Sequence, residues 1–502
     1  MRVKCLFAVI SGSLFALGFA PFSLWPLSLF SVCVLIHLME GMGKKESFII
    51  GFLYGIGYWL IGISWVYVSI HYHGNINEFS SSLITLLFIS CLSVYMGLFG
   101  ILYSYLSFES TKSTIIVFPI CWGLIEILRG ILFTGFPWLL AGTTISDTFL
   151  GGWISVIGSQ GNSIVLMIFC GALYALYKEI KNSDPLLYSS LIIGFIIVSS
   201  LVFKPINWTT PSHEIPVSVY QPNLTLEEKW SYEGIEQTQK MFESSVKEAL
   251  ESELIVFPET ALIQSRDEIE EWLQSINEAS KSKDISLLTG IIARSEDDRA
   301  NNLMRNRIMG LGSASGSYDK QQLVPFGEFI PLERFLGKLL DLMGLKLTNT
   351  VPGDQFSLIK STILKISPSI CYEIAYPSLI NQSAINSNIL VTISNDTWFG
   401  SSIGPEQHLQ LAKDRVLEHQ KPLLRSTNSG ISAIIDHRGN ILGKQEYFEE
   451  KTLKGRVVLQ EGNTPYNHIG NSILYFYITI MMVVSLLIKR NKVLFFKFLI
   501  NI

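Results

Sequence analysis

The chain has 502 residues, of which 48% are hydrophobic and only 16% are charged, and its mean hydropathy is +0.36. Residues 1–203 hold 16 of the Asp, Glu, Lys and Arg side chains, and the remaining 299 residues hold 64. Since a soluble domain carries about 25% charged residues, the first part is excluded as one. The net charge of −4 and the lack of a basic block argue against a nucleic-acid-binding protein. The composition indicates a membrane protein with a large water-facing domain.

Eight apolar stretches approach the ~20 residues that a transmembrane helix needs. In chain order they are residues 5–20, 24–39, 48–69, 80–107, 114–133, 152–176, 186–203 and 470–488. The first stretch resembles a signal peptide, but no small-residue cleavage site follows it, so we expect an uncleaved anchor. The sequence thus predicts a multi-pass α-helical domain of seven helices over residues 1–203, a closing helix over 470–488 and a tail over 489–502.

The lysines and arginines beside these stretches predict the orientation of the chain. Most of them fall on the side of the N-terminus, which by the positive-inside rule is the cytoplasmic side. An odd number of spans then puts residues 204–469 outside the cytoplasm. Five of the six cysteines lie in apolar stretches, and only Cys371 lies in the polar region. A single thiol in an oxidising compartment is typically retained for its chemistry.

Two ionisable residues fall inside the predicted membrane domain. Glu126 and Arg129 are three residues apart, so they share one face of a helix. Charged groups at membrane depth are usually functional. The alternative is that the two residues lie near the outer interface and only pair with each other, and both interpretations stay open. The segment Thr134–Trp138 is expected to break this helix. His71 and His73 lack further ligands nearby, so no metal site is expected.

The polar region alternates strand-like and helix-like segments, which predicts a layered α/β domain. The strand-like runs are Pro216–Tyr220, Leu254–Phe257, Ile285–Gly290, Leu303–Gly310, Thr362–Ile366, Ile389–Ile393 and Ser432–Ile435. The helix-like stretches are residues 226–249, 266–281 and 405–420.

A glutamate, a lysine and a cysteine each follow a strand-like run. Glu259 ends the segment LIVFPE, Lys320 ends YDK, and Cys371 begins CYE. Together these three residue types suit acyl transfer, because the thiol is a nucleophile, a partly buried carboxylate can remove its proton, and an ammonium can stabilise the oxyanion. Taken singly, each has a plainer interpretation: a helix cap for Glu259, a solvated charge for Lys320 and a packed core residue for Cys371.

As a set, these motifs resemble the nitrilase or carbon–nitrogen hydrolase superfamily, whose Glu-Lys-Cys triad lies in an α-β-β-α sandwich. Combined with the eight spans, the chain resembles the apolipoprotein N-acyltransferase family of the bacterial inner membrane. The resemblance covers nearly the whole chain. It includes residues Phe19–Phe22, Arg129–Gly130 with Thr134–Trp138, Lys320 with Pro325–Pro331, and Ser394–Gly400.

The family resemblance implies a two-step reaction. Cys371, deprotonated by Glu259, takes an acyl chain from a membrane phospholipid, phosphatidylethanolamine in the family, and passes it to the α-amino group of a diacylglyceryl-modified apolipoprotein. Lys320 and the backbone N–H of Tyr372 are expected to hold the oxyanion. No metal or organic cofactor is expected.

Four further residues take expected roles from the resemblance. Glu328 and Glu373 are expected to support the site, and Trp230 and Trp398 to line the substrate entrance at the membrane surface. Packing in the core is the alternative for Trp398.

The apolar stretch Phe335–Leu347 is expected to be either a mobile arm that touches lipid or a core helix. Two rival functions are a membrane-tethered amide or nitrile hydrolase, which would use the same triad with water, and a transporter whose outer domain merely binds substrate. Eight spans are more than a tether needs, and no inverted repeat is apparent.

Overall fold

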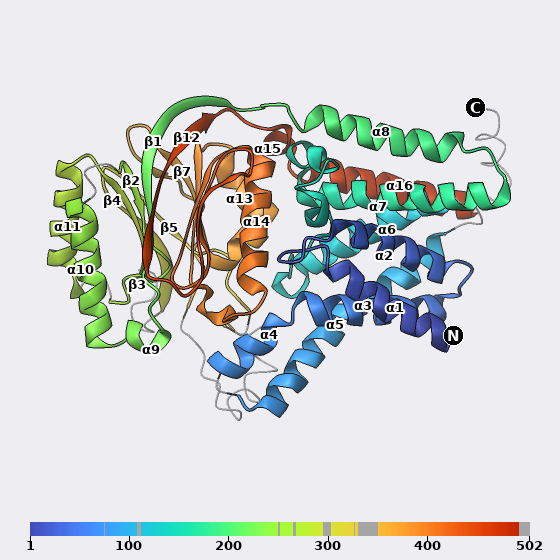
Figure 1. Ribbon diagram of the computed structural model, residues 1–502, viewed down its shortest axis with the longest axis horizontal. Coiled ribbons are helices and arrows are strands. Elements are labelled where there is room, and N and C mark those ends of the chain that lie inside the picture. Colours follow the sequence, from blue (N-terminus) through green and yellow to red (C-terminus); the bar gives the residue numbers. More distant parts are fainter. Residues whose placement is uncertain are drawn as a thin grey trace. The chain divides into compact units, whose positions relative to one another are not determined.

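The computed structural model describes residues 1–74, 76–107, 112–248, 252–264, 268–294, 303–325, 327–329 and 350–490 (Figure 1). The chain folds as two compact units. The first comprises Met1–Ile206, Ser402–Gln407 and Ile469–Ile502, and the second comprises Asn207–Ser401 and His408–His468. The expected arm at Phe335–Leu347 lies outside the described residues.

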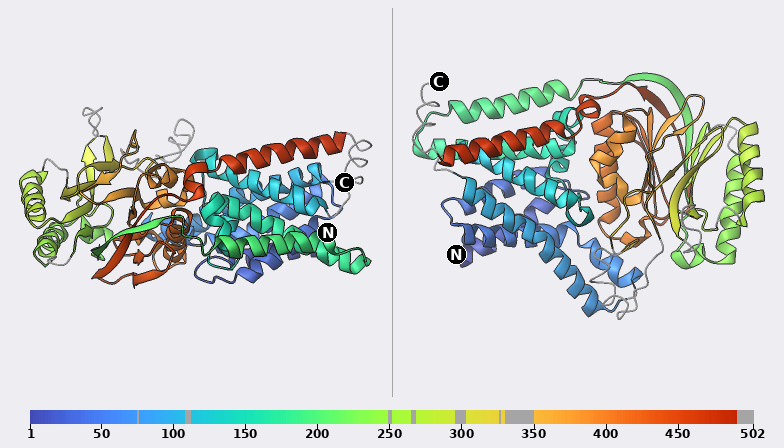
Figure 2. Two further views of the ribbon diagram at one scale, coloured as in Figure 1. Left: turned by 90° about the horizontal axis from the view of Figure 1, so that it is seen from above. Right: turned by 180° about the vertical axis from the view of Figure 1, so that it is seen from behind.

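The first unit is built of helices that run alongside one another, as both views of Figure 2 show. Its α-helices are α1 (Arg2–Ala16), α2 (Trp25–Met39), α3 (Lys44–Gly62), α4 (Trp65–Val68), α5 (Glu78–Leu106), α6 (Lys112–Ile131), α7 (Ile154–Asn182), α8 (Leu187–Phe203) and α16 (Ser472–Arg490). Shorter helical turns are η1 (Ser69–His73), η2 (Leu132–Thr134), η3 (Ala141–Ile145) and η4 (Gly151–Trp153).

The prediction of eight spans is met in part. Among the described residues, three helical stretches are long and apolar enough to cross a membrane: Glu78–Leu106, Lys112–Thr134 and Gly151–Asn182. A fourth is a pair of helices, Lys44–Gly62 and Trp65–His73, bent by 57°. The apolar helices α2 and α8 have 15 and 17 residues. At 1.5 Å per residue they extend about 23 to 26 Å, less than the ~30 Å hydrocarbon core of a bilayer.

Glu126 and Arg129 hold the backbone that follows their helix. The Glu126 Oε1 atom accepts hydrogen bonds from Trp122 Nε1 at 2.9 Å and from the Ala141 N–H at 2.8 Å. Arg129 Nη1 donates to the carbonyl oxygens of Phe136 at 2.7 Å and Trp138 at 2.5 Å. Both side chains are buried. Their contacts give the pair a structural task, which is to satisfy the polar backbone of the segment where α6 ends.

The second unit contains twelve described strands in two six-stranded sheets. One sheet has the order β12-β1-β2-β3-β4-β5, and the other β11-β10-β9-β8-β7-β6. The strands are β1 (Thr210–Gln221), β2 (Leu254–Val256), β3 (Ser286–Arg294), β4 (Met304–Gly312), β5 (Ser317–Asp319), β6 (Ile359–Lys360), β7 (Lys365–Ile370), β8 (Ile389–Ser394), β9 (Leu423–Thr427), β10 (Ser432–Ile435), β11 (Ile441–Gln445) and β12 (Lys451–Glu461).

Helices cover the outer face of each sheet. The α-helices in this part of the described chain are α9 (Leu226–Lys229), α10 (Tyr232–Glu248), α11 (Glu270–Ser282), α13 (Pro377–Ala384), α14 (Gly404–His419) and α15 (Pro465–Ile469). Figure 1 shows α10 and α11 against one sheet and α13 and α14 against the other. The α/β prediction is confirmed, and the layers are arranged as an α-β-β-α sandwich.

The alternation of side chains along the strands explains this layering. In β2, Leu254 and Val256 belong to a buried cluster between the two sheets, whereas Ile255 belongs to a second cluster beneath α10 and α11. Successive side chains of a strand point to opposite faces, so a strand that is apolar throughout requires cover on both sides. Because β2 runs parallel to β1 and β3, and β8 runs parallel to β7 and β9, residues that follow parallel strands of one sheet emerge at a common edge.

Candidate active site

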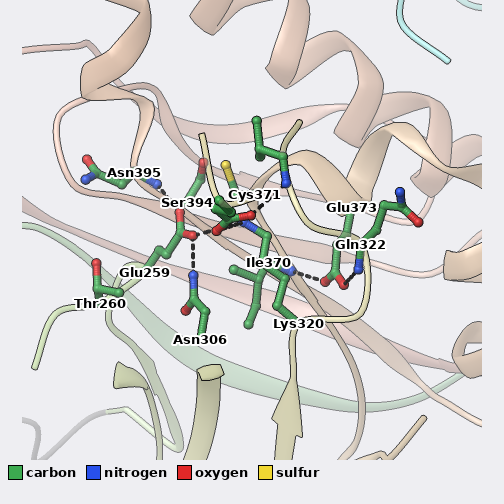
Figure 3. A network of polar contacts seen from close by, with 12 residues as sticks. Glu259, Thr260, Asn306, Lys320, Gln322, Ile370, Cys371, Glu373, Ser394 and Asn395 are labelled. Carbon is green, nitrogen blue, oxygen red and sulfur yellow. Dashed lines mark hydrogen bonds and ion pairs between the residues drawn. The ribbon is translucent and has the colours of Figure 1, made fainter. Parts of the chain in front are cut away.

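The structure brings Glu259, Lys320 and Cys371 together at the ends of three strands. Glu259 follows β2, Lys320 follows β5, and Cys371 follows β7. The Lys320 Nζ atom lies 3.4 Å from Glu259 Oε1. Figure 3 shows the Cys371 thiol beside these two side chains, and the charges of both act on it. The three residues that the sequence predicted as a group are therefore neighbours in space.

Glu259 is held in place by a side chain and by backbone. Its Oε1 atom accepts a hydrogen bond of 2.6 Å from Asn306 Nδ2, and its Oε2 atom accepts one of 2.8 Å from the Asn395 N–H. The Glu259 side chain is 8% exposed. Burial strengthens its interaction with Lys320 because the local dielectric constant is low. A buried carboxylate beside a thiol is positioned to accept the proton of that thiol.

Lys320 is a buried cation paired with two carboxylates. Its side chain is 1% exposed, and its Nζ atom lies 2.7 Å from Glu328 Oε1. Burial alone lowers the pKa of the ammonium, but the carboxylates of Glu328 and Glu259 raise that pKa well above its usual value. The group therefore remains charged at neutral pH. A fixed positive charge in a desolvated site is suited to stabilise an oxyanion.

Cys371 begins a tight turn directly after β7. Its backbone φ is +54°, in the left-handed region that a non-glycine residue adopts only when its surroundings impose it. The side chain is only partly buried. Burial and the negative charge of Glu259 raise the pKa of the thiol, while Lys320 and a hydrogen bond with Ser394 lower it. The net shift is upward, so the resting group is a thiol that needs a base to become a nucleophile.

Glu373 ties the cysteine turn to the loop that carries Lys320. Its Oε1 atom accepts hydrogen bonds from Tyr318 OH, Gln321 N and Gln322 N at 2.7 to 3.1 Å, and Oε2 accepts one of 2.7 Å from Ile370 N. Burial raises the pKa of this carboxyl to about 7, although the hydrogen bonds from the backbone lower it. Glu373 is thus a structural link between two segments of the site.

The other predicted residues lie around these groups. Tyr372 is 7% exposed, and its ring packs edge-on against Tyr376 with the centroids 5.2 Å apart. Trp230 follows α9 and Trp398 lies in the turn after β8, and their side chains are 61% and 45% exposed. Exposure of large aromatic rings fits an entrance, whereas packing in the core would have buried them.

Several polar residues of the site had no signal in the sequence. Asn306 lies within β4, where nothing in its neighbourhood distinguishes it from other polar strand residues. Lys229 donates to the backbone carbonyl of Glu259 at 3.0 Å and to Thr260 Oγ1 at 2.9 Å. His408 lies in the expected helix 405–420, and its Nε2 atom is 3.1 Å from the Cys371 carbonyl oxygen. Each of these contacts joins segments that are far apart in the sequence.

The arrangement offers carboxylates and an ammonium, and no cluster of metal ligands. Across the described ranges, no group of three or more His, Cys, Asp or Glu side chains is placed to hold a metal ion. A thiol, a base and a fixed cation together provide the groups that covalent acyl transfer requires.

Comparison with known proteins matches two family models to different parts of the chain. Residues 11–173 match the family model described as the apolipoprotein N-acyltransferase N-terminal domain, and residues 217–463 match the carbon-nitrogen hydrolase model. A carbon-nitrogen hydrolase structure from Helicobacter pylori G27 is 18% identical and covers 49% of this chain and 89% of that chain, with a TM-score of 0.37.

Curated relatives match almost end to end. The apolipoprotein N-acyltransferase of Photobacterium profundum is 32% identical over 97% of this chain and 96% of that protein. The enzyme of the same name from Pseudomonas syringae pv. tomato is 33% identical over 92% of each. The chain therefore belongs to the apolipoprotein N-acyltransferase family.

Proposed function

We propose that this chain moves a fatty acyl group from a membrane phospholipid to an apolipoprotein by way of a thioester on Cys371. Its family makes it an acyltransferase whose acceptor is an apolipoprotein. The proposal adds the covalent intermediate, the roles of the three residues and the donor. The observation that carries it is that the Cys371 thiol lies beside a buried carboxylate, Glu259, and a buried ammonium, Lys320. The Lys320 Nζ atom is 3.4 Å from Glu259 Oε1.

In the first step the thiol attacks the ester carbonyl of the phospholipid. Glu259 accepts the thiol proton as the carbon–sulfur bond forms, and the carbonyl oxygen becomes an oxyanion held by Lys320 and the N–H of Tyr372. Collapse of this intermediate breaks the carbon–oxygen bond. The lysophospholipid leaves as an alcohol with the proton that Glu259 returns, and the acyl chain remains on Cys371.

In the second step the α-amino group of the diacylglyceryl-cysteine at the apolipoprotein N-terminus attacks the thioester. Glu259 accepts a proton from the amine, and the same two groups hold the oxyanion. Breaking the carbon–sulfur bond releases an amide and a thiolate, which takes the proton back from Glu259. The two half-reactions use one site in succession, which makes the kinetics ping-pong.

The nature of both substrates supports a site at a membrane surface. Each presents its reactive group at the interface while its acyl chains stay in the bilayer, and phosphatidylethanolamine is the proposed donor. We propose that residues 1–203 and 470–488 span the inner membrane in eight passes. Residues 204–469 then form the catalytic domain on the periplasmic side, as the distribution of lysine and arginine predicts, and residues 489–502 form a cytoplasmic tail.

The proposal is tested by mass spectrometry of the purified full-length protein before and after incubation with phosphatidylethanolamine, without an acceptor. We expect an added fatty-acyl mass on the peptide that holds Cys371, removed by hydroxylamine and absent in Cys371→Ala. Cys91→Ala is the matched control, because Cys91 is an exposed free cysteine. Cys91 itself should carry no adduct, so the Cys91→Ala variant should still be acylated on Cys371. A thiol that stays free and alkylatable, or steady release of fatty acid without an acceptor, would contradict the proposal.

A further inference from the structure

His408 contacts the backbone of the proposed nucleophile, Cys371. The imidazole is fully buried, and its Nε2 atom lies 3.1 Å from the carbonyl oxygen of Cys371. A carbonyl oxygen can only accept a hydrogen bond, so Nε2 must carry the proton. The histidine therefore acts as a donor to the peptide group that joins Cys371 to Tyr372.

Two buried charged side chains contact the other ring nitrogen. His408 Nδ1 lies 2.9 Å from Asp396 Oδ1 and 3.0 Å from Arg425 Nη2. The same Arg425 Nη2 atom lies 2.6 Å from Asp396 Oδ2. Because Nη2 carries two hydrogens, it can donate one to the carboxylate and one to Nδ1. Nδ1 thus faces one acceptor, Asp396 Oδ1, and one donor, Arg425 Nη2. In either role of Nδ1, the carbonyl oxygen of Cys371 requires the proton on Nε2, and the two charged side chains hold the ring where it can donate to Cys371.

The geometry of the peptide bond extends this contact into the site. The Cys371 C=O and the Tyr372 N–H belong to one planar trans unit and point in opposite directions. A donor that fixes the direction of the carbonyl therefore fixes the direction of the N–H as well. A hydrogen bond to the carbonyl also polarises the amide and strengthens its N–H as a donor. The φ of +54° at Cys371 requires such support, since its surroundings must hold it there.

We propose that His408, oriented by Asp396 and Arg425, is a positioning residue that aims the Tyr372 N–H at the oxyanion formed in acyl transfer. This inference rests on the proposed function, in which that N–H and Lys320 share the oxyanion. His408 itself touches neither substrate nor the reacting sulfur in this scheme. Its contribution is the orientation of one peptide plane, which is needed in both half-reactions.

Two amide substitutions of His408 test the contact at Nε2 separately from the contacts at Nδ1. The amide nitrogen of His408→Gln can replace Nε2 and keep the bond to the Cys371 carbonyl. The amide of His408→Asn reaches only the position of Nδ1. It keeps the contacts with Asp396 and Arg425 but loses the hydrogen bond to the Cys371 carbonyl. In both variants the two buried charges remain paired with each other, which limits the loss of stability.

Two rates are measured on full-length protein in detergent: thioester formation from phosphatidylethanolamine, and alkylation of Cys371 by iodoacetamide. Alkylation requires the thiolate of Cys371 but forms no oxyanion. We expect His408→Asn to slow thioester formation at least about tenfold, and to leave alkylation within about twofold of wild type. His408→Gln should restore most of the rate of thioester formation. A parallel fall of both rates would indicate a merely structural role and would overturn the inference.

Wild-type thioester formation in His408→Asn would also overturn the inference, and would leave the proposed function intact. Absence of an acyl adduct in the wild-type protein itself would overturn the proposed function, and this inference with it. If His408→Asn does not yield folded protein, His408→Leu provides the same comparison, because leucine fills the buried volume without a donor.

Discussion

The Lys320 ammonium lies closer to Glu328 than to the proposed base, at 2.7 Å from Glu328 Oε1 and 3.4 Å from Glu259 Oε1. This difference matters for a base that must gain and lose a proton in each half-reaction. If Glu259 were the sole counter-charge, its protonation would leave a buried cation unpaired, which is costly. Glu328, at the shorter distance from Lys320, supplies a second counter-charge for the cation while Glu259 changes its protonation state.

Glu328→Gln is therefore expected to slow the chemistry. Removing the second counter-charge forces Glu259 to compensate Lys320 and makes it a poorer base, so thioester formation should fall by about ten- to a hundredfold. The measurement is the rate of fatty-acyl adduct formation on Cys371 by mass spectrometry. Glu236→Gln is the matched control, since Glu236 forms an ion pair with Lys240 that is exposed on both sides. Wild-type thioester formation in Glu328→Gln would remove Glu328 from the site.

Glu259→Gln should have opposite effects on the acidity of Cys371 and on its acylation. The negative charge of Glu259 is one of the causes that raise the pKa of the thiol, so its removal should shift the alkylation profile of Cys371 to lower pH. Acyl transfer should nevertheless fall by about a hundredfold or more, because the base is lost. The test is the pH dependence of iodoacetamide alkylation beside the rate of thioester formation. An unchanged alkylation profile would contradict the placement of Glu259 beside the thiol.

Sequence analysis could predict those site residues that belong to a local motif at the end of a strand. Glu259, Lys320 and Cys371 each follow a strand, so the trio was accessible to sequence analysis. That β2 and β5 belong to one sheet and β7 to the other was not. Asn306 and His408 were not. Their contacts depend on which strand or helix lies next to which, and a single asparagine in a strand or histidine in a helix carries no local signature of that.

Strand boundaries were least accurate where a proline interrupts the pattern. The sequence predicted a strand at Thr362–Ile366, whereas β7 runs over Lys365–Ile370 and includes Pro368. Proline lacks an N–H and usually marks the edge of a sheet. In this strand Pro368 is in register with Val391 of β8, while on the other side β6 ends before reaching it. Because no strand pairs with Pro368 on that side, its missing N–H leaves no carbonyl oxygen of a neighbouring strand without a donor. Only the topology of the sheet reveals this.

Glu373→Gln should destabilise the protein and slow acylation together. All four groups that contact the carboxylate are donors: Tyr318 OH and the N–H groups of Gln321, Gln322 and Ile370. An amide must point its NH₂ at one of them, and an unsatisfied buried donor costs about 1–3 kcal/mol.

Thermal unfolding in detergent and the rate of thioester formation measure the two effects of Glu373→Gln. Tyr318→Phe is the control that removes one donor only, and it should cost less. A Glu373→Gln variant as stable and as active as wild type would show that the link between the two loops is dispensable.

The burial of Lys229 predicts that the stability of the protein depends on pH. The side chain is 5% exposed, and burial lowers the pKa of its ammonium from 10.5 to about 8, while Glu259 raises it slightly in return. Below pH 8 the lysine is charged in the folded and unfolded states, and the folded state bears the full cost of burying the charge. Between pH 8 and 10.5 the folded state is neutral while the unfolded state still binds a proton. Stability should therefore rise with pH across this window, by up to about 3 kcal/mol.

The comparison that isolates this effect is the difference in melting temperature between wild type and Lys229→Met at pH 7.5 and at pH 10. The hydrogen bonds of Lys229 to the Glu259 carbonyl and Thr260 are lost at both values, so the change of the difference with pH reports the titration. We expect wild type to gain stability relative to Lys229→Met as the pH rises. Lys240→Met is the control, because Lys240 is exposed and bears no cost of burial. A melting-temperature difference for Lys229→Met that is the same at both pH values would contradict the lowered pKa of Lys229 in the folded protein.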